Sequence, residues 1–193
     1  MTYPPQSPNP QPQYAAPVGG VAGPGEPFDG ATTPDDLTRP LYGASFGQAI
    51  KRFFKNYANF KGRASRSEYW WTMLFTFLLE LVPLVLIMIG AFSVAGSAIS
   101  GSTTDVYGET TLTPEAATAA GGGVAVAIVG YILLVIIGLA ILIPTLAINW
   151  RRLHDANFAG PFWFLSLTSV GGIIVLVFTL LPPKPEGRRF DAR

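Results

Sequence analysis

This 193-residue chain contains no cysteine and only one histidine. Disulfide frameworks, thiolate metal sites and cysteine nucleophiles are therefore excluded, and one histidine cannot build a histidine-based metal cluster. Charge is also scarce, because charged residues make up 13% of the chain, about half the share found in soluble domains. The start of the chain lacks a cationic segment followed by an apolar one, so we expect no cleavable signal peptide. We expect no cofactor.

Long stretches of the chain carry almost no charge. Between Trp71 and Asp105 the only charged residue is Glu80, and residues 116–150 contain none. Apolar runs of about 20 residues are typical of transmembrane helices. The pattern predicts an all-α, polytopic helical membrane protein with three transmembrane helices, over about residues 70–90, 126–148 and 162–181.

The first two predicted helices are joined by residues 93–121, which are rich in Gly, Ser and Thr. Within this connection, Thr113-Pro114-Glu115 is typical of a helix start, with Thr113 as the cap and Pro114 in the first turn. The prolines Pro83 and Pro144 are expected to kink the first two helices.

Residues 1–43 are rich in proline and glycine and contain almost no long aliphatic side chains. Such a segment cannot bury enough apolar surface to offset the entropy of ordering, so we predict a disordered cytoplasmic tail. The tail is a solvated tether or, alternatively, an extended recognition peptide. Residues 44–193 form the predicted integral membrane domain.

An amphipathic helix is predicted over about residues 45–58. One face carries an apolar stripe at helical spacing, formed by Phe46, Ile50, Phe53, Phe54 and Tyr57. The cations Lys51, Arg52 and Lys55 lie away from that stripe. We expect the helix to lie in the membrane interface with its cations facing anionic lipid, and packing on the protein's own helices is the alternative.

Orientation follows from the positions of cations and aromatic rings. Amphipathic rings settle among lipid head groups, and the predicted interfacial anchors are Tyr69, Trp70, Trp71, Trp150 and Trp163. Counts of Lys and Arg in the flanks favour a cytoplasmic N-terminus. The cationic C-terminal tail disagrees, because three spans place it outside. A re-entrant hairpin broken at Gly171-Gly172 would return it inside, but limbs of about ten residues are too short to span, so three spans are retained.

Two motifs are more specific than these patterns: NYANFKGRASRSEYWWTMLF at residues 56–75 and RRLHDANFAGPFW at residues 151–163. Together they resemble the paired signatures of a bacterial inner-membrane family known as domain of unknown function 805. The resemblance covers about residues 46–190. It implies a small three-span protein of the bacterial plasma (inner) membrane with a cytoplasmic N-terminus and no established activity.

The family's first signature matches Gly62, Arg63, Arg66, Glu68, Tyr69 and Trp70, and its second matches Arg151, Arg152, Leu153, His154, Asp155 and Gly160. The chain departs from the pattern after the second motif, where Pro161-Phe162 precedes Trp163, and at residues 188–191, which read Arg-Arg-Phe-Asp.

If the first two spans are antiparallel neighbours, the two motifs meet at one membrane level. The candidate site then consists of Arg63, Arg66, Glu68, Arg151, Arg152, His154 and Asp155. One hypothesis is a structural clamp, since the arginine fork binds carboxylate bidentately. Two carboxylates cannot neutralise four arginines, so the alternative is binding of an anionic lipid head group or a phosphate-bearing ligand.

Catalysis is not expected. No phosphate-binding, zinc-protease or serine-hydrolase motif is present, and the adjacent side chains of His154 and Asp155 are expected to point apart, although Ser65 and Ser67 are available as nucleophiles. Glu80, near the middle of the first span, is either a protonated carboxyl bonded to a neighbouring helix or part of a proton or ion path.

The sequence therefore favours a structural or interaction protein of the plasma membrane. The alternative is a small transporter or channel subunit that acts as an oligomer, with Glu80 in its path. The expected partners are the lipid bilayer, including anionic lipids, and either a second copy of the chain or another membrane protein. Nucleic acid is not expected.

Overall fold

The computed structural model describes residues 30–191. The predicted recognition peptide falls largely outside these residues. The chain divides into two compact units. One, here called the polar unit, consists of Met1–Thr72 and Leu146–Arg193, and the other, here called the hairpin unit, is Met73–Thr145.

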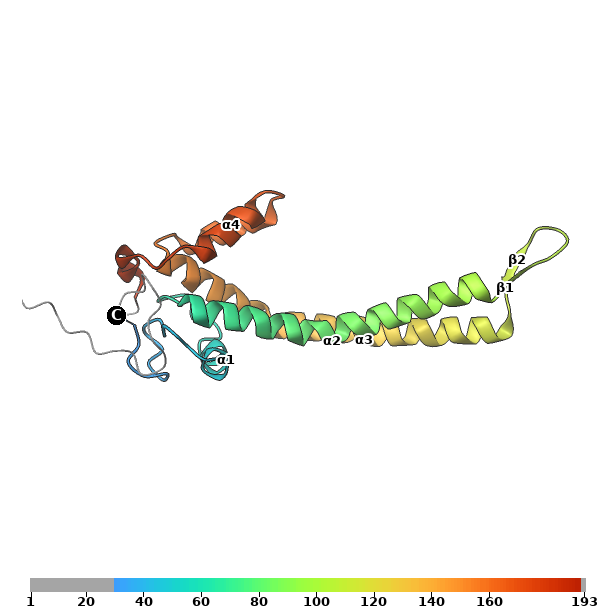
Figure 1. The fold of residues 1–193 in the computed structure, drawn as a ribbon, viewed down its shortest axis with the longest axis horizontal. Helices are drawn as coiled ribbons and strands as arrows, with labels where there is room; N and C mark the ends of the chain where they lie inside the picture. The colour runs from blue at the N-terminus through green and yellow to red at the C-terminus, as the bar shows by residue number, and fades with distance from the viewer. Residues whose placement is uncertain (1–29, 192–193) are drawn as a thin grey trace, which may run out of the picture. The chain divides into compact units, whose positions relative to one another are not determined.

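Two long helices are the longest elements of the described chain (Figure 1). Helix α2 covers Arg66–Ser100 and α3 covers Pro114–Asp155. The predicted spans over 70–90 and 126–148 lie inside them. At about 1.5 Å per residue, 35 and 42 residues are longer than a hydrocarbon core of about 30 Å. In each helix only 11% of the most apolar 18-residue window is buried, so neither resembles the core helix of a soluble protein.

Glycines allow the two helices of the hairpin unit to pack closely. A Cβ on Gly90 would lie 2.7 Å from the backbone nitrogen of Ala127, and one on Gly130 would lie 2.9 Å from the carbonyl oxygen of Pro83. The two helices therefore approach closely enough that a larger residue has no room. Small residues allow this approach in membranes, where apolar side chains gain little by leaving lipid.

The predicted connection over residues 93–121 is mostly helical. Only a short antiparallel β-hairpin separates the helices, with β1 at Ser102–Thr104 and β2 at Thr110–Leu112 (Figure 1). The predicted helix start is confirmed, because α3 begins at Pro114 and the hydroxyl of Thr113 accepts a hydrogen bond from the N–H of Ala116 at 3.3 Å.

The third predicted span is not a single helix, and this corrects the prediction for residues 162–181. The segment forms a 3-10 helix, η1 at Gly160–Leu167, and a ten-residue helix, α4 at Gly171–Leu180. Ten residues rise about 15 Å, half the thickness of a hydrocarbon core. The break between η1 and α4 falls just before the glycine pair at 171–172, and α4 ends just before Pro182.

The polar unit begins earlier than predicted. Residues 30–43 were expected to be disordered, yet Ala31, Leu41 and Tyr42 are completely buried. The disorder prediction counted the segment's few apolar side chains but not its backbone, whose polar groups bind buried side chains elsewhere in the unit.

Helix α1 covers Phe46–Lys55, and η2 near the C-terminus covers Pro185–Phe190. The predicted apolar stripe of α1 is divided between two environments. Phe53 is 1% exposed, whereas Phe46 and Phe54 are 40% and 47% exposed. The buried face of α1 also contains a cation, Arg52.

Candidate functional site

The carboxylate of Glu68 is a centre of buried polar contacts in the first turn of α2. Its Oε2 accepts hydrogen bonds from the N–H groups of Ser65 and Leu41, each at 3.0 Å. The Ser65 hydroxyl in turn accepts from the N–H of Glu68 at 3.1 Å. This reciprocal capping box satisfies N–H groups that a helix start leaves unpaired. The spacing Ser65-Arg66-Ser67-Glu68 is a signal for it that the sequence analysis did not use.

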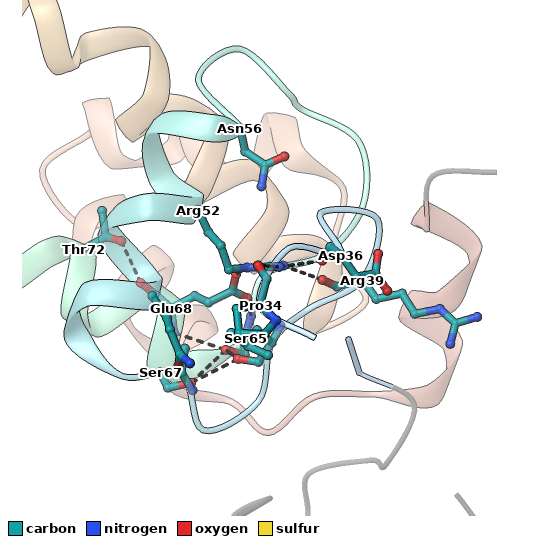
Figure 2. A network of polar contacts seen from close by, with 12 residues as sticks. Pro34, Asp36, Arg39, Arg52, Asn56, Ser65, Ser67, Glu68 and Thr72 are labelled. Atoms are coloured by element: carbon teal, nitrogen blue, oxygen red, sulfur yellow. Dashed lines mark hydrogen bonds and ion pairs between the residues drawn. The ribbon is translucent and has the colours of Figure 1, made fainter. Parts of the chain in front are cut away.

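Arg52 binds the other oxygen of Glu68. Its Nε donates to Oε1, and its remaining nitrogens donate to backbone carbonyl oxygens of Pro34, Asp36 and Arg39 (Figure 2). The side chain is 1% exposed. The prediction that Arg52 faces anionic lipid is therefore wrong, and the same guanidinium explains why residues 30–43 are ordered.

Asp155, the last residue of α3, is the second buried carboxylate. Arg152 donates to its Oδ2 at 2.6 Å, and the Tyr42 hydroxyl donates to its Oδ1 at 3.1 Å. A nitrogen of Arg63 lies 3.5 Å from Oδ1, and both side chains of that ion pair are completely buried. Groups from three separate segments thus surround one carboxylate.

Arg152 and Arg63 also bind the C-terminal part of the chain. Nε of Arg152 donates to the carbonyl oxygen of Thr179 at 3.0 Å, and another of its nitrogens donates to that of Leu181. These carbonyls end α4 and have no partner inside that helix. Arg63 binds the carboxylate of Asp191 bidentately, at 2.7 and 2.8 Å.

His154 also contacts other parts of the polar unit. Its Nδ1 lies 3.0 Å from the carbonyl oxygen of Gly62, and its ring stacks on Phe190 with centroids 4.0 Å apart. Gly187 lies so close that a Cβ there would be 2.5 Å from the backbone oxygen of His154. The imidazole is therefore enclosed by the C-terminal segment.

Arg151 differs from its neighbour. It is 2% exposed, and its Nε has no hydrogen-bond partner within the described part of the chain. The charges that act on it are Glu68 and, with the opposite sign, Arg52. Its backbone does contribute a link, since the N–H of Ala64 donates to the carbonyl oxygen of Arg151 at 3.0 Å.

The structure thus brings together most of the predicted cluster and adds two members. Arg52 joins the cations and Asp191 joins the carboxylates. The arginines that are 2% exposed or less are Arg52, Arg63, Arg151 and Arg152. The carboxylates bound to them are Glu68, Asp155 and Asp191. Arg66 is half-buried at the edge of the cluster.

The predicted interfacial anchors divide into two groups. Trp70 and Trp71 are 39% and 40% exposed, as expected for rings among head groups. Tyr69 is instead buried, with its hydroxyl donating to Asn149 at 3.1 Å, so its assignment as an anchor is wrong. Trp150 and Trp163 are half-buried, and the ring of Trp150 occupies the space where a Cβ of residue 160 would lie.

Glu80 belongs to the hairpin unit and is half-buried. Within the described residues it forms no ion pair. Neither role predicted for it is tested by this environment.

An exposed charge cluster lies at the rim of the polar unit. The ammonium groups of Lys55 and Lys51 lie 2.9 and 3.0 Å from the carboxylate of Asp35. The hydrogen bonds and positive charge of these lysines lower the pKa of Asp35 from its ordinary 3.8 to about 2. These two cations are thus partly neutralised by the chain itself.

Comparison with known proteins gives the family. Residues 57–192 match the family described as "Protein of unknown function (DUF805)". The chain belongs to this family. The chain is also similar to the inner membrane protein YhaH of Escherichia coli strains K12 and O157:H7, with 29% identity over 145 residues, covering 72% of this chain and 89% of YhaH. No solved structure matches the chain.

The match confirms the family resemblance carried by the two motifs. An all-α inner-membrane protein of unknown function accords with the helices α2 and α3, which are long and apolar enough to cross a membrane.

Proposed function

We propose that this member of the DUF805 family is a multi-pass structural or interaction protein of the inner membrane, with its N-terminus and the charged cluster of its polar unit on the cytoplasmic side. Support comes from the charge distribution. All 13 Lys and Arg residues of the chain fall in the polar unit, and none falls in Met73–Thr145. Cytoplasmic segments near membrane spans carry such an excess of Lys and Arg.

The polar unit acts as a clamp in this proposal. The main support for the clamp is that the buried guanidinium groups donate hydrogen bonds to the chain's own carboxylates and carbonyl oxygens. These groups belong to Arg52, Arg63 and Arg152. Removing one partner of a buried ion pair typically costs about 3–5 kcal/mol, because the other charge is left uncompensated. The network therefore fixes the N-terminal segment, both helix ends and the C-terminal tail as one unit.

Contacts with anionic lipid fall to exposed cations in this proposal. Lys61, Lys184 and Arg189 are exposed at the rim of the unit, where each adds about 1 kcal/mol of attraction to an anionic leaflet. The buried arginines are less suited to bind a head group, since most of their donors already have acceptors.

The proposal includes no catalytic role. Two of the three candidate groups are engaged in structural contacts: the hydroxyl of Ser65 donates to the carbonyl oxygen of Leu41 at 2.6 Å, and His154 faces Gly62 and Phe190. A nucleophile needs a base within hydrogen-bond reach, and these contacts direct both groups elsewhere.

The orientation is tested with alkaline phosphatase, which is active only in the periplasm, inserted after Asp105 in the β-hairpin of the full chain. We expect high phosphatase activity in cells. An insertion at Ala58 in the polar unit is the matched control and is expected to be inactive. An inactive enzyme at Asp105 together with an active one at Ala58 would contradict the proposed orientation.

The clamp is distinguished from a lipid site by mass spectrometry of cardiolipin and phosphatidylglycerol that copurify with the protein. The decisive variant is Arg151→Met, because Nε of Arg151 has no partner among the described residues. We expect this variant to retain lipid as the parent does, and a Lys61→Gln/Lys184→Gln/Arg189→Gln variant to retain less. Lipid loss on Arg151→Met alone would make the cluster a lipid site.

A further inference from the structure

Within the polar unit, the segment between α3 and η2 returns to the residue at which it begins. Asp155 is the last residue of α3, and its carbonyl oxygen accepts a hydrogen bond from the N–H of Lys184 at 2.9 Å. Beyond that point the N–H of Gly62 donates to the carbonyl oxygen of Phe190 at 2.7 Å. Residues 156–183 therefore form a closed excursion with both ends in the same unit.

This excursion is suited to lipid. Residues 156–183 contain no charged side chain and no histidine. Large apolar side chains near its tip are widely exposed, with Leu167 at 75%, Val170 at 66% and Ile173 at 66%. Several large apolar side chains exposed on one short segment favour contact with a membrane or another apolar partner.

Some backbone groups at the tip have partners within the protein. The hydroxyl of Thr168 donates to the carbonyl oxygen of Leu165 at 2.8 Å and accepts from the N–H of Gly171 at 3.1 Å. At the other end of α4, Arg152 binds the carbonyl oxygens of Thr179 and Leu181. Lipid offers no hydrogen bonds to polar backbone groups, so a segment that enters a membrane needs partners of this kind from the protein itself.

Length decides how deep the segment can reach. Helix α4 has ten residues, which rise about 15 Å, whereas the hydrocarbon core is about 30 Å thick. The helix can reach about the midplane but cannot cross. We propose that residues 156–183 form a re-entrant hairpin that inserts among the acyl chains of one leaflet and returns the C-terminal tail to the side it came from.

The hairpin rests on the proposed function only for the identity of the leaflet, which is the cytoplasmic one. It also removes the charge conflict of a three-span arrangement. The tail cations Lys184, Arg188 and Arg189 then share a side with the rest of the polar unit, as the positive-inside rule favours.

The test uses single cysteines in the full chain, since the natural sequence has none. The exposed positions Ala58, Tyr107, Ser169 and Glu186 are each changed to cysteine. Each variant is treated with a membrane-impermeant maleimide in spheroplasts and in inverted membrane vesicles, and again after denaturation in SDS as the control for reactivity.

We expect Ala58→Cys and Glu186→Cys to react only in inverted vesicles, and Tyr107→Cys only in spheroplasts. Position 169 is exposed in the single chain, so protection of Ser169→Cys is expected to come from lipid around the inserted tip. We expect at least a tenfold lower rate of reaction for it from either side, with full reaction in SDS.

Two outcomes overturn the hairpin. Reaction of Ala58→Cys and Glu186→Cys from opposite sides would show that the segment crosses the membrane. Rapid reaction of Ser169→Cys from either side would show that the tip lies in water. If Ala58→Cys and Glu186→Cys react from the same side but in spheroplasts, the hairpin stands and the proposed orientation fails.

Discussion

The polar unit and the hairpin unit are held together by opposite means. The polar unit buries charge: arginines and carboxylates from four segments satisfy one another and the ends of helices. The hairpin unit contains no Lys or Arg and brings its helices together through glycines such as Gly90 and Gly123. In lipid, apolar side chains gain little by leaving the solvent, so close backbone packing must replace hydrophobic burial. A polar network in which most of the buried charges are paired can hold the other unit.

The largest expected effect comes from Glu68→Gln, which tests the polar side of this contrast. The change leaves the guanidinium of Arg52 buried without its anion, and it also removes the negative charge of Glu68 that acts on Arg151. We expect the free energy of unfolding to fall by about 3–5 kcal/mol, measured by unfolding in mixed micelles.

The matched control is Glu186→Gln, because Glu186 is exposed. That change is expected to stay within about 0.5 kcal/mol of the parent. Faster trypsin cleavage at Arg39 should accompany Glu68→Gln, since Arg52 binds the backbone of that segment. Equal stability of both variants would mean that the buried pair does not hold the unit together.

Adjacent arginines provide a finer test within the polar unit. Arg152→Met removes the short ion pair with Asp155. It also removes two hydrogen bonds that Arg152 donates to backbone carbonyl oxygens at the end of α4. We expect a loss of about 3 kcal/mol, at the lower end of the range for buried pairs because Arg63 remains beside Asp155.

Arg151→Met should behave differently. It removes a buried cation whose Nε has no partner in the described residues, so the desolvation relieved roughly offsets the attraction lost. We expect a change below about 1 kcal/mol in the same unfolding assay. An equal and large loss from both variants would refute the distinction between the two residues.

The hairpin unit is tested by overpacking. Gly90→Leu places a side chain where a Cβ would lie 2.7 Å from backbone and side-chain atoms of Ala127. We expect a loss of about 1–3 kcal/mol, because the helices must separate. Gly96→Leu on the same helix is the control, since nothing lies within 4 Å of its Cβ position. The comparison between the two variants cancels the gain in helix propensity from replacing glycine.

The smallest expected effect comes from Asp35→Asn at the exposed rim. Lys55 and Lys51 lower the pKa of Asp35 from 3.8 to about 2 in the folded protein. A lowered pKa means that the contribution to stability is present above pH 3.8 and is lost as the pH falls toward 2. The difference in stability between parent and Asp35→Asn, followed from pH 5 to pH 2, should shrink as the pH falls. A difference that stays constant over this range would contradict the ion pairs.

The contrast between the units also explains which predictions held. The first two spans could be predicted because a charge-free apolar run is a local property of the chain. The start of α3 at Pro114 was likewise local, since one threonine and one proline define it. The meeting of the two motifs needed one further assumption, that the helices pair.

Other features depended on partners distant in sequence. Arg52 looked like a lipid-facing cation because its acceptors are Glu68 and the carbonyls of residues 34–39. Composition made residues 30–43 look disordered for the same reason. The third span looked complete because composition does not distinguish a helix that crosses from two short limbs that return.

By itself, therefore, the sequence determined that this protein belongs in a membrane, where along the chain its first two helices lie, and that its cations fall outside residues 73–145. These properties follow from transfer free energies that add residue by residue along the chain. Only the tertiary structure decided which arginines are buried, that residues 30–43 belong to the folded unit and that residues 156–183 turn back. A buried charge is stable only beside its partner, and Arg52, Arg63 and Arg152 have acceptors that only the folded chain brings within reach.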